Sequence, residues 1–221
     1  MKKAIQRCSF VAIVVFVCFA FISQGYGAIN WWGDVQPPDP STWIWRTEAY
    51  VGGYDDGGIS VTEGDNIEAD EAYVGYGADA SGIATIDGAG SSWSCEERLA
   101  VGYYGQGILE ISNGGSVSRG GGSIGYIFGS TGEVSVDGAG SNWSCGGVCV
   151  GSAGQGILEI SNGGNVSCGG GSIGCESRSM GIVTVDGAGS SWSCSGSLYI
   201  GKYGQGTLEI SSGGNVSCEY G

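Results

Sequence analysis

The segment GQGILEISNGG occurs twice without change, at residues 105–115 and 154–164, and a third time as GQGTLEISSGG at residues 204–214. Self-similarity at a fixed interval of about 50 residues indicates stacked copies of one structural unit. Each interval divides into two similar halves when a half is begun at the glycine before an alternating segment. These glycines are separated by 24 or 25 residues: Gly57, Gly82, Gly107, Gly132, Gly156, Gly181 and Gly206.

Each 25-residue unit contains three short segments with the character of β-strands. In the first, alternation places Leu109 and Ile111 on one face and Ile108 and Glu110 on the other. The second is a tryptophan or valine followed by serine, and the third ends in an apolar residue before glycine. Glycine-rich DGAGS or SNGG turns separate them. Three strands in about 25 residues describe one rung of a parallel β-solenoid, where a rung is one complete circuit of the chain.

We therefore predict an all-β fold, a right-handed, single-stranded parallel β-helix whose rungs stack ~4.8 Å apart. A β-propeller is the alternative, but it requires four-stranded blades, and the 25-residue period favours the solenoid. Equivalent side chains of successive rungs should form columns. The two predicted inward columns of the first strand are Ala84, Leu109, Val134, Leu158, Val183, Leu208 and Ile86, Ile111, Val136, Ile160, Val185, Ile210. A third column alternates large and small residues: Trp93, Val117, Trp143, Val166, Trp192 and Val216.

The N-terminal sequence predicts export. MKKAIQR carries three positive charges, and an apolar run from Phe10 to Ile22 follows, as in a secretory signal peptide. Small residues at Gly25 and Gly27 predict a signal peptide of residues 1–27, although an uncleaved anchor is the alternative. Residues 28–56 hold all three prolines and four tryptophans, and we expect an N-terminal cap there. Residues 57–221 form the β-solenoid repeat domain, in which the last rung is incomplete, so we expect a fragment or truncated product with an exposed end.

Composition excludes several classes of function. The predicted mature chain has five basic residues against 22 acids, a net charge of −17, so nucleic acid is an unfavourable partner. Histidine is absent, which excludes histidine bases and histidine metal ligands. No segment of the mature chain is apolar enough to predict a transmembrane span.

The units resemble the repeats shared by type V secretion passengers and PEP-CTERM-associated exported proteins. The resemblance is carried by GEVSVDGAGSNWSCGGVCVGSAGQGILEISNGG (132–164) and by its relatives at 181–214 and 82–115, and it covers residues 82–221. It implies a surface-exposed or secreted β-solenoid of a Gram-negative-type bacterium, associated with the outer membrane or released. It implies no catalytic residues. The Val-Pro-Glu-Pro sorting tail and outer-membrane barrel that would anchor such proteins are not in this sequence.

Cysteines of the WSC and VSC segments should share one column: Cys95, Cys145, Cys168, Cys194 and Cys218, with Ala69 and Arg119 at its other places. Adjacent rungs lie within disulfide reach, so Cys145, Cys168, Cys194 and Cys218 are a candidate disulfide column. The allowed pairings are Cys145–Cys168 with Cys194–Cys218, or Cys168–Cys194 alone; reduced thiols at a corner and a thiolate metal site are alternatives. Cys149 and Cys175 do not align with each other, and the pattern assigns them no role.

Asp87, Asp137 and Asp186 form a column on every second rung, ~10 Å apart. We predict that each caps its own turn by accepting N–H groups of the glycines that follow. Calcium binding and inverting glycoside hydrolysis are the alternatives.

These observations predict a non-catalytic, adhesin-like or structural surface protein without a cofactor or metal; a polysaccharide-binding or polysaccharide-cleaving β-helix is the alternative. Its partner is not specified; a surface polysaccharide, a host or neighbouring cell surface, and end-to-end self-association are candidates.

Overall fold

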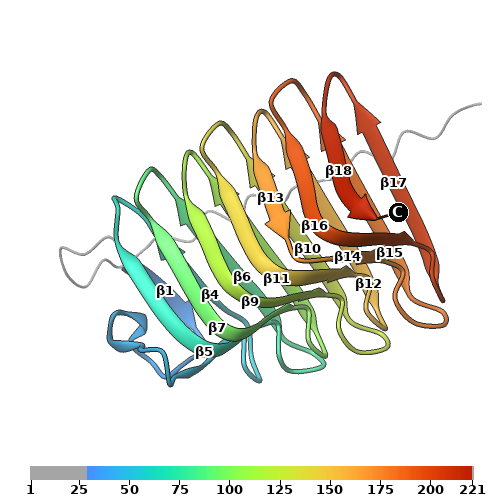
Figure 1. The fold of residues 1–221 in the computed structure, drawn as a ribbon. Helices are drawn as coiled ribbons and strands as arrows, with labels where there is room; N and C mark the ends of the chain where they lie inside the picture. Colours follow the sequence, from blue (N-terminus) through green and yellow to red (C-terminus); the bar gives the residue numbers. More distant parts are fainter. Residues whose placement is uncertain (1–28, 221) are drawn as a thin grey trace, which may run out of the picture.

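A computed structural model describes residues 29–220, and the predicted signal peptide lies outside them. The chain is a parallel β-solenoid of about seven rungs spaced about 25 residues apart, stacked side by side in sequence order (Figure 1). Two sheets run the length of the stack. The first contains β1 (Ile29–Gly33), β4 (Gly57–Val61), β6 (Ser81–Asp87), β8 (Gln106–Ser112), β10 (Thr131–Asp137), β12 (Gln155–Ser161), β15 (Met180–Asp186) and β17 (Gln205–Ser211).

The second sheet holds the remaining strands of each rung. They are β2 (Val35–Gln36), β3 (Glu48–Val51), β5 (Asn66–Val74), β7 (Ser92–Val101), β9 (Ser116–Ile124), β11 (Asn142–Val150), β13 (Asn165–Cys168), β14 (Gly171–Ile173), β16 (Ser191–Ile200) and β18 (Asn215–Tyr220). The predicted three strands per rung are therefore mostly two, because the second and third segments join into one long bent strand. Inter-rung bonding continues through the bend, where β7 carries a bulge between Cys95 and Arg98. Among the described rungs, the one that contains β13 and β14 is the only one in which the long strand is divided at the bend.

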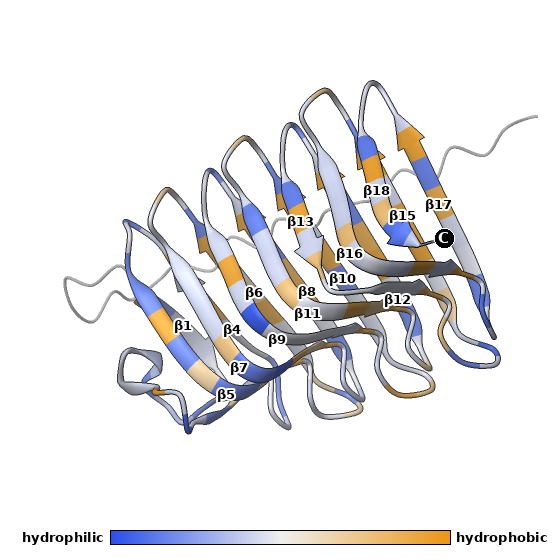
Figure 2. Ribbon diagram, viewed as in Figure 1, coloured by the Kyte–Doolittle hydropathy of each residue, from blue (hydrophilic) through white to orange (hydrophobic). Residues whose placement is uncertain are grey.

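The predicted register is confirmed from rung to rung. Gly82 pairs with Gly57 and Gly107, and the same glycine pairing continues to Gly206. The two columns of the first strand point inward and are fully buried in the middle of the stack, including Leu109, Leu158 and Ile160. Figure 2 shows the resulting alternation of hydrophobic and hydrophilic bands along strands such as β17. In the last described rung the equivalent Ile210 is about half exposed.

The tryptophan column forms the largest part of the core. Trp93, Trp143 and Trp192 are almost completely buried, and each aligns with a valine or isoleucine of the neighbouring rung. Each of the last two rings also reaches a glycine of the preceding rung: a Cβ at Gly122 would lie 2.5 Å from Cζ2 of Trp143, and one at Gly171 would lie 2.7 Å from Cζ2 of Trp192. A large ring in one rung is thus accommodated by small residues in the rung before it.

At the N-terminal side, two short strands run antiparallel to the stack. β1 pairs with β4, and β2 pairs with β3, while β3 itself is parallel to β5 and pairs Glu48 with Glu71. The connection contains the 3-10 helix η1 (Pro40–Thr42) and Trp43, whose ring lies 6.3 Å from that of Trp93. Residues 29–56 thus cover the edges of the first complete rung, as the backbone of an edge strand requires.

Candidate functional site

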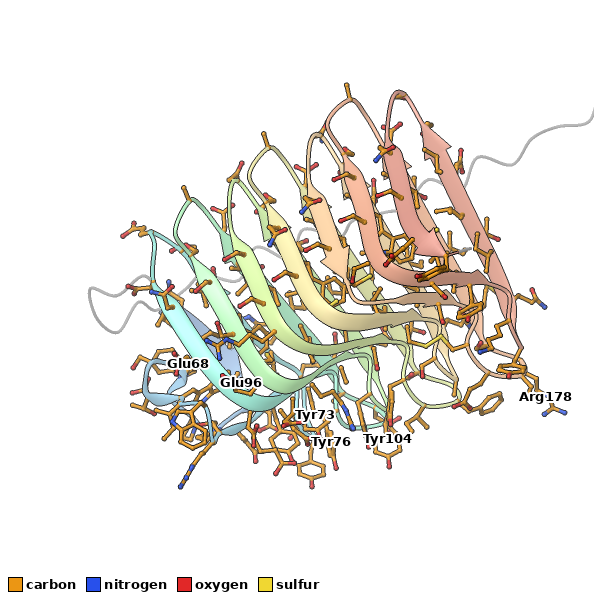
Figure 3. All side chains as sticks on the ribbon, in the orientation of Figure 1. Glu68, Tyr73, Tyr76, Glu96, Tyr104 and Arg178 are labelled. Carbon is orange, nitrogen blue, oxygen red and sulfur yellow. A yellow bond between two sulfur atoms is a disulfide. The ribbon has the colours of Figure 1, made fainter. Side chains whose placement is uncertain are left out.

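Seven tyrosines from four consecutive rungs gather at one end of the long strands, and we call this set the tyrosine patch: Tyr50, Tyr54, Tyr73, Tyr76, Tyr103, Tyr104 and Tyr126. Figure 3 shows the labelled Tyr73, Tyr76 and Tyr104 on the same side of the solenoid. Most of them lie in the loops that follow β3, β5, β7 and β9. Backbone bonds hold these loops in register, since Tyr76, Tyr103 and Tyr126 each donate an N–H to the glycine carbonyl of the preceding rung.

The rings alternate between stacked and perpendicular contacts. Tyr103 stacks on Tyr76 with centroids 5.2 Å apart and on Tyr126 at 4.9 Å, whereas Tyr104 meets Tyr76 edge-on at 84°. Tyr54 likewise meets Tyr76 at 88°. Both geometries are favourable for aromatic quadrupoles, so the rings support one another and form a continuous aromatic surface.

Charged groups border the tyrosine patch. The Tyr73 hydroxyl donates a hydrogen bond to Glu71, and Arg98 lies 5.5 Å from the centre of the Tyr126 ring. Desolvation, followed by the bond to Glu71, raises the pKa of Tyr73; desolvation and Glu48 raise that of Tyr50 in the same way. Tyr50 and Tyr73 therefore stay protonated throughout the physiological pH range, with their hydroxyls bonded to Glu48 and Glu71.

The cysteine column has the predicted register. Cys145 pairs with Cys168, Cys168 with Cys194, and Cys194 with Cys218, while Arg119 stands between Cys95 and Cys145. The column lies at the bend of the long strands, and three of its cysteines are buried in the core. Arg119 reaches solvent because its φ of 81° turns its side chain outward, where it forms an ion pair with Glu96.

All five column cysteines are thiols in this structure, and the candidate disulfides among them are not formed. The nearest sulfurs are those of Cys168 and Cys194, 3.0 Å apart. A hydrogen bond from the Cys194 thiol, supported by Trp192 Nε1 at 3.3 Å, lowers the pKa of Cys168 to about 7. The same contact raises the pKa of Cys194, and burial raises that of Cys145 to about 12. This part of the column lines a groove of about 600 Å³ together with outward-facing serines.

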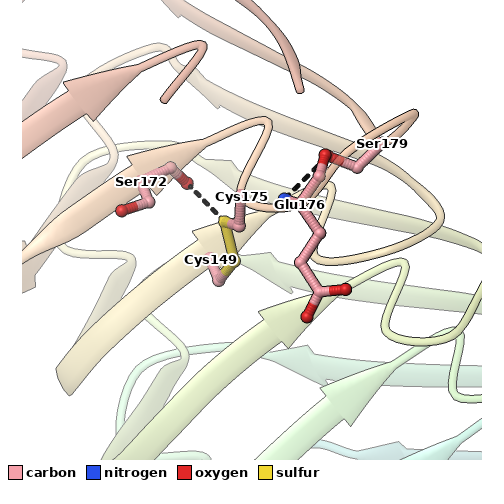
Figure 4. Close-up of a disulfide and its surroundings, with 5 residues drawn as sticks. All are labelled: Cys149, Ser172, Cys175, Glu176 and Ser179. Carbon is pink, nitrogen blue, oxygen red and sulfur yellow. Dashed lines mark hydrogen bonds between the residues drawn. A yellow bond between two sulfur atoms is a disulfide. The ribbon is translucent and has the colours of Figure 1, made fainter. Parts of the chain in front are cut away.

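The disulfide that the structure does contain joins Cys149 and Cys175, two residues to which the sequence pattern assigned no role (Figure 4). Cys149 pairs with Ser172 in the strand register, so Cys175 lies three positions beyond its column. Gly174 has φ of 70° and turns the chain back, which brings the two Cα atoms to 6.4 Å. Column alignment alone could not reveal this bridge, because the two cysteines meet only across the turn.

Peptide mapping of oxidised protein should recover Cys149–Cys175 as the main bridge and Cys168–Cys194 as the first additional one. Cross-links between cysteines two rungs apart, such as Cys145–Cys194, should be absent, because their backbones are ~10 Å apart and beyond disulfide range. A dominant Cys145–Cys194 peptide would contradict the 25-residue stacking. Closing a loop of 26 residues should stabilise the Cys149–Cys175 region by about 3 kcal/mol.

The aspartate column has a different role from the one predicted. Ser112 Oγ and Asn113 Nδ2 of the following rung each donate to Asp87 Oδ1 at 2.6 Å. Ser161 and Asn162 do the same at Asp137, and Ser211 at Asp186. These carboxylates therefore link successive rungs, whereas we expected each to cap its own turn. Asp186 also receives a contribution from its own glycine: the N–H of Gly187 lowers its pKa, after the larger effects of the bonds from Ser211 and Ser212.

In the second and third DGAGS segments, the final serine makes the bond within its own turn. Ser141 Oγ donates to the carbonyl of Asp137 at 2.6 Å and accepts the N–H of Gly114 in the preceding rung at 3.0 Å. Ser190 makes the equivalent pair of bonds with Asp186 and Gly163. Both serines are buried, so these bonds satisfy groups that water cannot reach.

Within residues 29–220, no group of three histidine, cysteine, aspartate or glutamate side chains is arranged to hold a metal ion. In the same range, no helix has the length and apolar character needed to cross a membrane. Comparison with protein-family models, with curated proteins and with solved structures finds no match to this chain.

Proposed function

We propose that this chain is an exported, non-catalytic scaffold of the cell surface or the extracellular medium, of a structural or adhesin-like kind. The observation that carries this proposal is the use of its repeated carboxylates. Asp87 and Asp137 each accept two side-chain bonds from the next rung, and Asp186 accepts bonds from Ser211 and Ser212. A carboxylate occupied in the same way in successive repeats stabilises the stack and does not act as an acid or base at a single reaction centre.

Further support comes from the surface and from the sequence. The net charge is strongly negative, and the N-terminal segment has the pattern of a secretory signal. The repeats resemble those of secreted passenger proteins, which project a long, rigid solenoid. A rigid rod of stacked rungs suits the presentation of a surface away from the cell.

Incubation of the protein with neutral and acidic polysaccharides should release no new reducing ends. Asp137→Asn is the informative variant, because the amide keeps an acceptor oxygen for Ser161 while removing the charge that catalysis would need. Cleavage by the wild-type chain that disappears in Asp137→Asn, with an unchanged circular dichroism spectrum, would replace the scaffold by the polysaccharide-cleaving alternative.

A further inference from the structure

We propose that the tyrosine patch binds an uncharged polysaccharide, with Tyr54 and Tyr104 as the two rings on which sugar units stack. This inference names a partner for the proposed scaffold and so deepens its adhesin-like role. It depends on the geometry of the patch and not on the repeated aspartates, so its test is separate from the test for cleavage.

Tyr54 and Tyr104 are the exposed members of the patch, at 74% and 44% of their full surface. They occupy equivalent loop positions two rungs apart, or roughly 10 Å along the stack, a length close to that of two linked sugar rings. The residue at the same position in the rung between them is Gly77, so the ring between Tyr54 and Tyr104 is that of Tyr76, one position earlier in the loop. Glycine is required there by a close backbone approach, since a Cβ would lie 2.7 Å from the carbonyl oxygen of Gly53.

The inner tyrosines hold the two exposed rings in place. Tyr76 contacts Tyr54 at 6.1 Å and Tyr104 at 5.8 Å between centroids, in both cases nearly perpendicular. Tyr73, which is buried, supports Tyr76 in turn at 5.4 Å. An aromatic surface that is already ordered loses little conformational entropy when a ligand stacks on it.

The polar groups of the patch select the class of ligand. Glu48 and Glu71 border it, and Asp55 and Asp79 belong to the same loops as Tyr54 and Tyr76. This surface is rich in hydrogen-bond acceptors, which fits the many hydroxyl donors of a sugar. These four carboxylates outnumber Arg98, the cation beside Tyr126, and the net negative charge of the patch disfavours acidic polysaccharides and nucleic acid. A proline-rich peptide offers mainly carbonyl acceptors, so it fits an acceptor-rich surface less well than a sugar does.

Affinity electrophoresis in gels containing hydroxyethylcellulose, followed by titration with cellohexaose, tests this proposal on the purified chain. The wild-type protein should be retarded. Tyr54→Ala and Tyr104→Ala should each weaken the association about fivefold or more, because each removes one stacking ring. Tyr104→Phe, which keeps the ring and removes the hydroxyl, should retain most of the binding.

Tyr203→Ala is the matched control. Tyr203 occupies the equivalent loop position after β16 and is 68% exposed, but it contacts Lys202 and no patch tyrosine. Binding to neither neutral probe, or binding equally weakened by Tyr203→Ala, would overturn the proposal. Tighter binding of polygalacturonate or of an oligoproline peptide than of cellohexaose would overturn it as well, in favour of a different ligand. Circular dichroism confirms that each variant is folded.

Discussion

Replacing Trp143 by alanine should lower the free energy of unfolding by about 3 to 5 kcal/mol, the range for truncation of a large buried aromatic residue. Trp143 is 1% exposed, aligns with valines of both neighbouring rungs, and packs over Gly122. None of these small residues can expand to fill the space that the indole leaves. The cavity therefore persists, and the contacts on both sides of the rung are lost.

Urea unfolding followed by far-ultraviolet circular dichroism measures this effect. Trp45→Ala is the control, because Trp45 is 52% exposed and its removal opens no cavity; its expected change is within about 0.5 kcal/mol. Equal midpoints for the two variants would mean that the indole of Trp143 does not lie in the core.

Leu158→Ala should destabilise the fold by about 2 to 5 kcal/mol, whereas Ile157→Ala on the same strand should have a much smaller effect. Leu158 is completely buried between Val134 and Val183, and Ile157 is 38% exposed on the other face of β12. The two residues are chemically similar neighbours, so the difference between the two changes in unfolding free energy shows which side chain points into the core. A larger effect from Ile157→Ala would mean that the strand is registered with the opposite face inward.

The sequence predicted the architecture because glycine and apolar residues recur at positions that stacking requires to be equivalent. Leu109, Val134 and Leu158 can form a column only if the backbone repeats every rung, and the structure places them so. The bend was less predictable: whether the second and third segments of a rung form one strand depends on local geometry such as the bulge near Cys95, which no periodicity encodes.

The candidate site depended on contacts outside the columns, and the sequence revealed less of it. Ser112 and Asn113 carry the bonds to Asp87, a link that requires the relative height of two turns to be known. The tyrosine patch has one signal in the sequence: a tyrosine directly follows the glycine after the third segment of a rung, at Tyr76, Tyr103 and Tyr126. Its most exposed members, Tyr54 and Tyr104, lie one position later in the loop and so fall outside that pattern. The patch as a whole is therefore visible only in three dimensions.

The alternation of large and small core residues has a consequence for how such a chain can lengthen or shorten in evolution. Trp143 packs over Gly122 and Trp192 packs over Gly171. The smallest unit that can be repeated with the same core contacts at both of its ends is therefore a pair of rungs. Duplication or deletion of one rung would place two tryptophan rungs, or two glycine rungs, next to each other. Gene duplication should therefore preserve the core only in steps of about 50 residues, which matches the spacing of the three GQG segments.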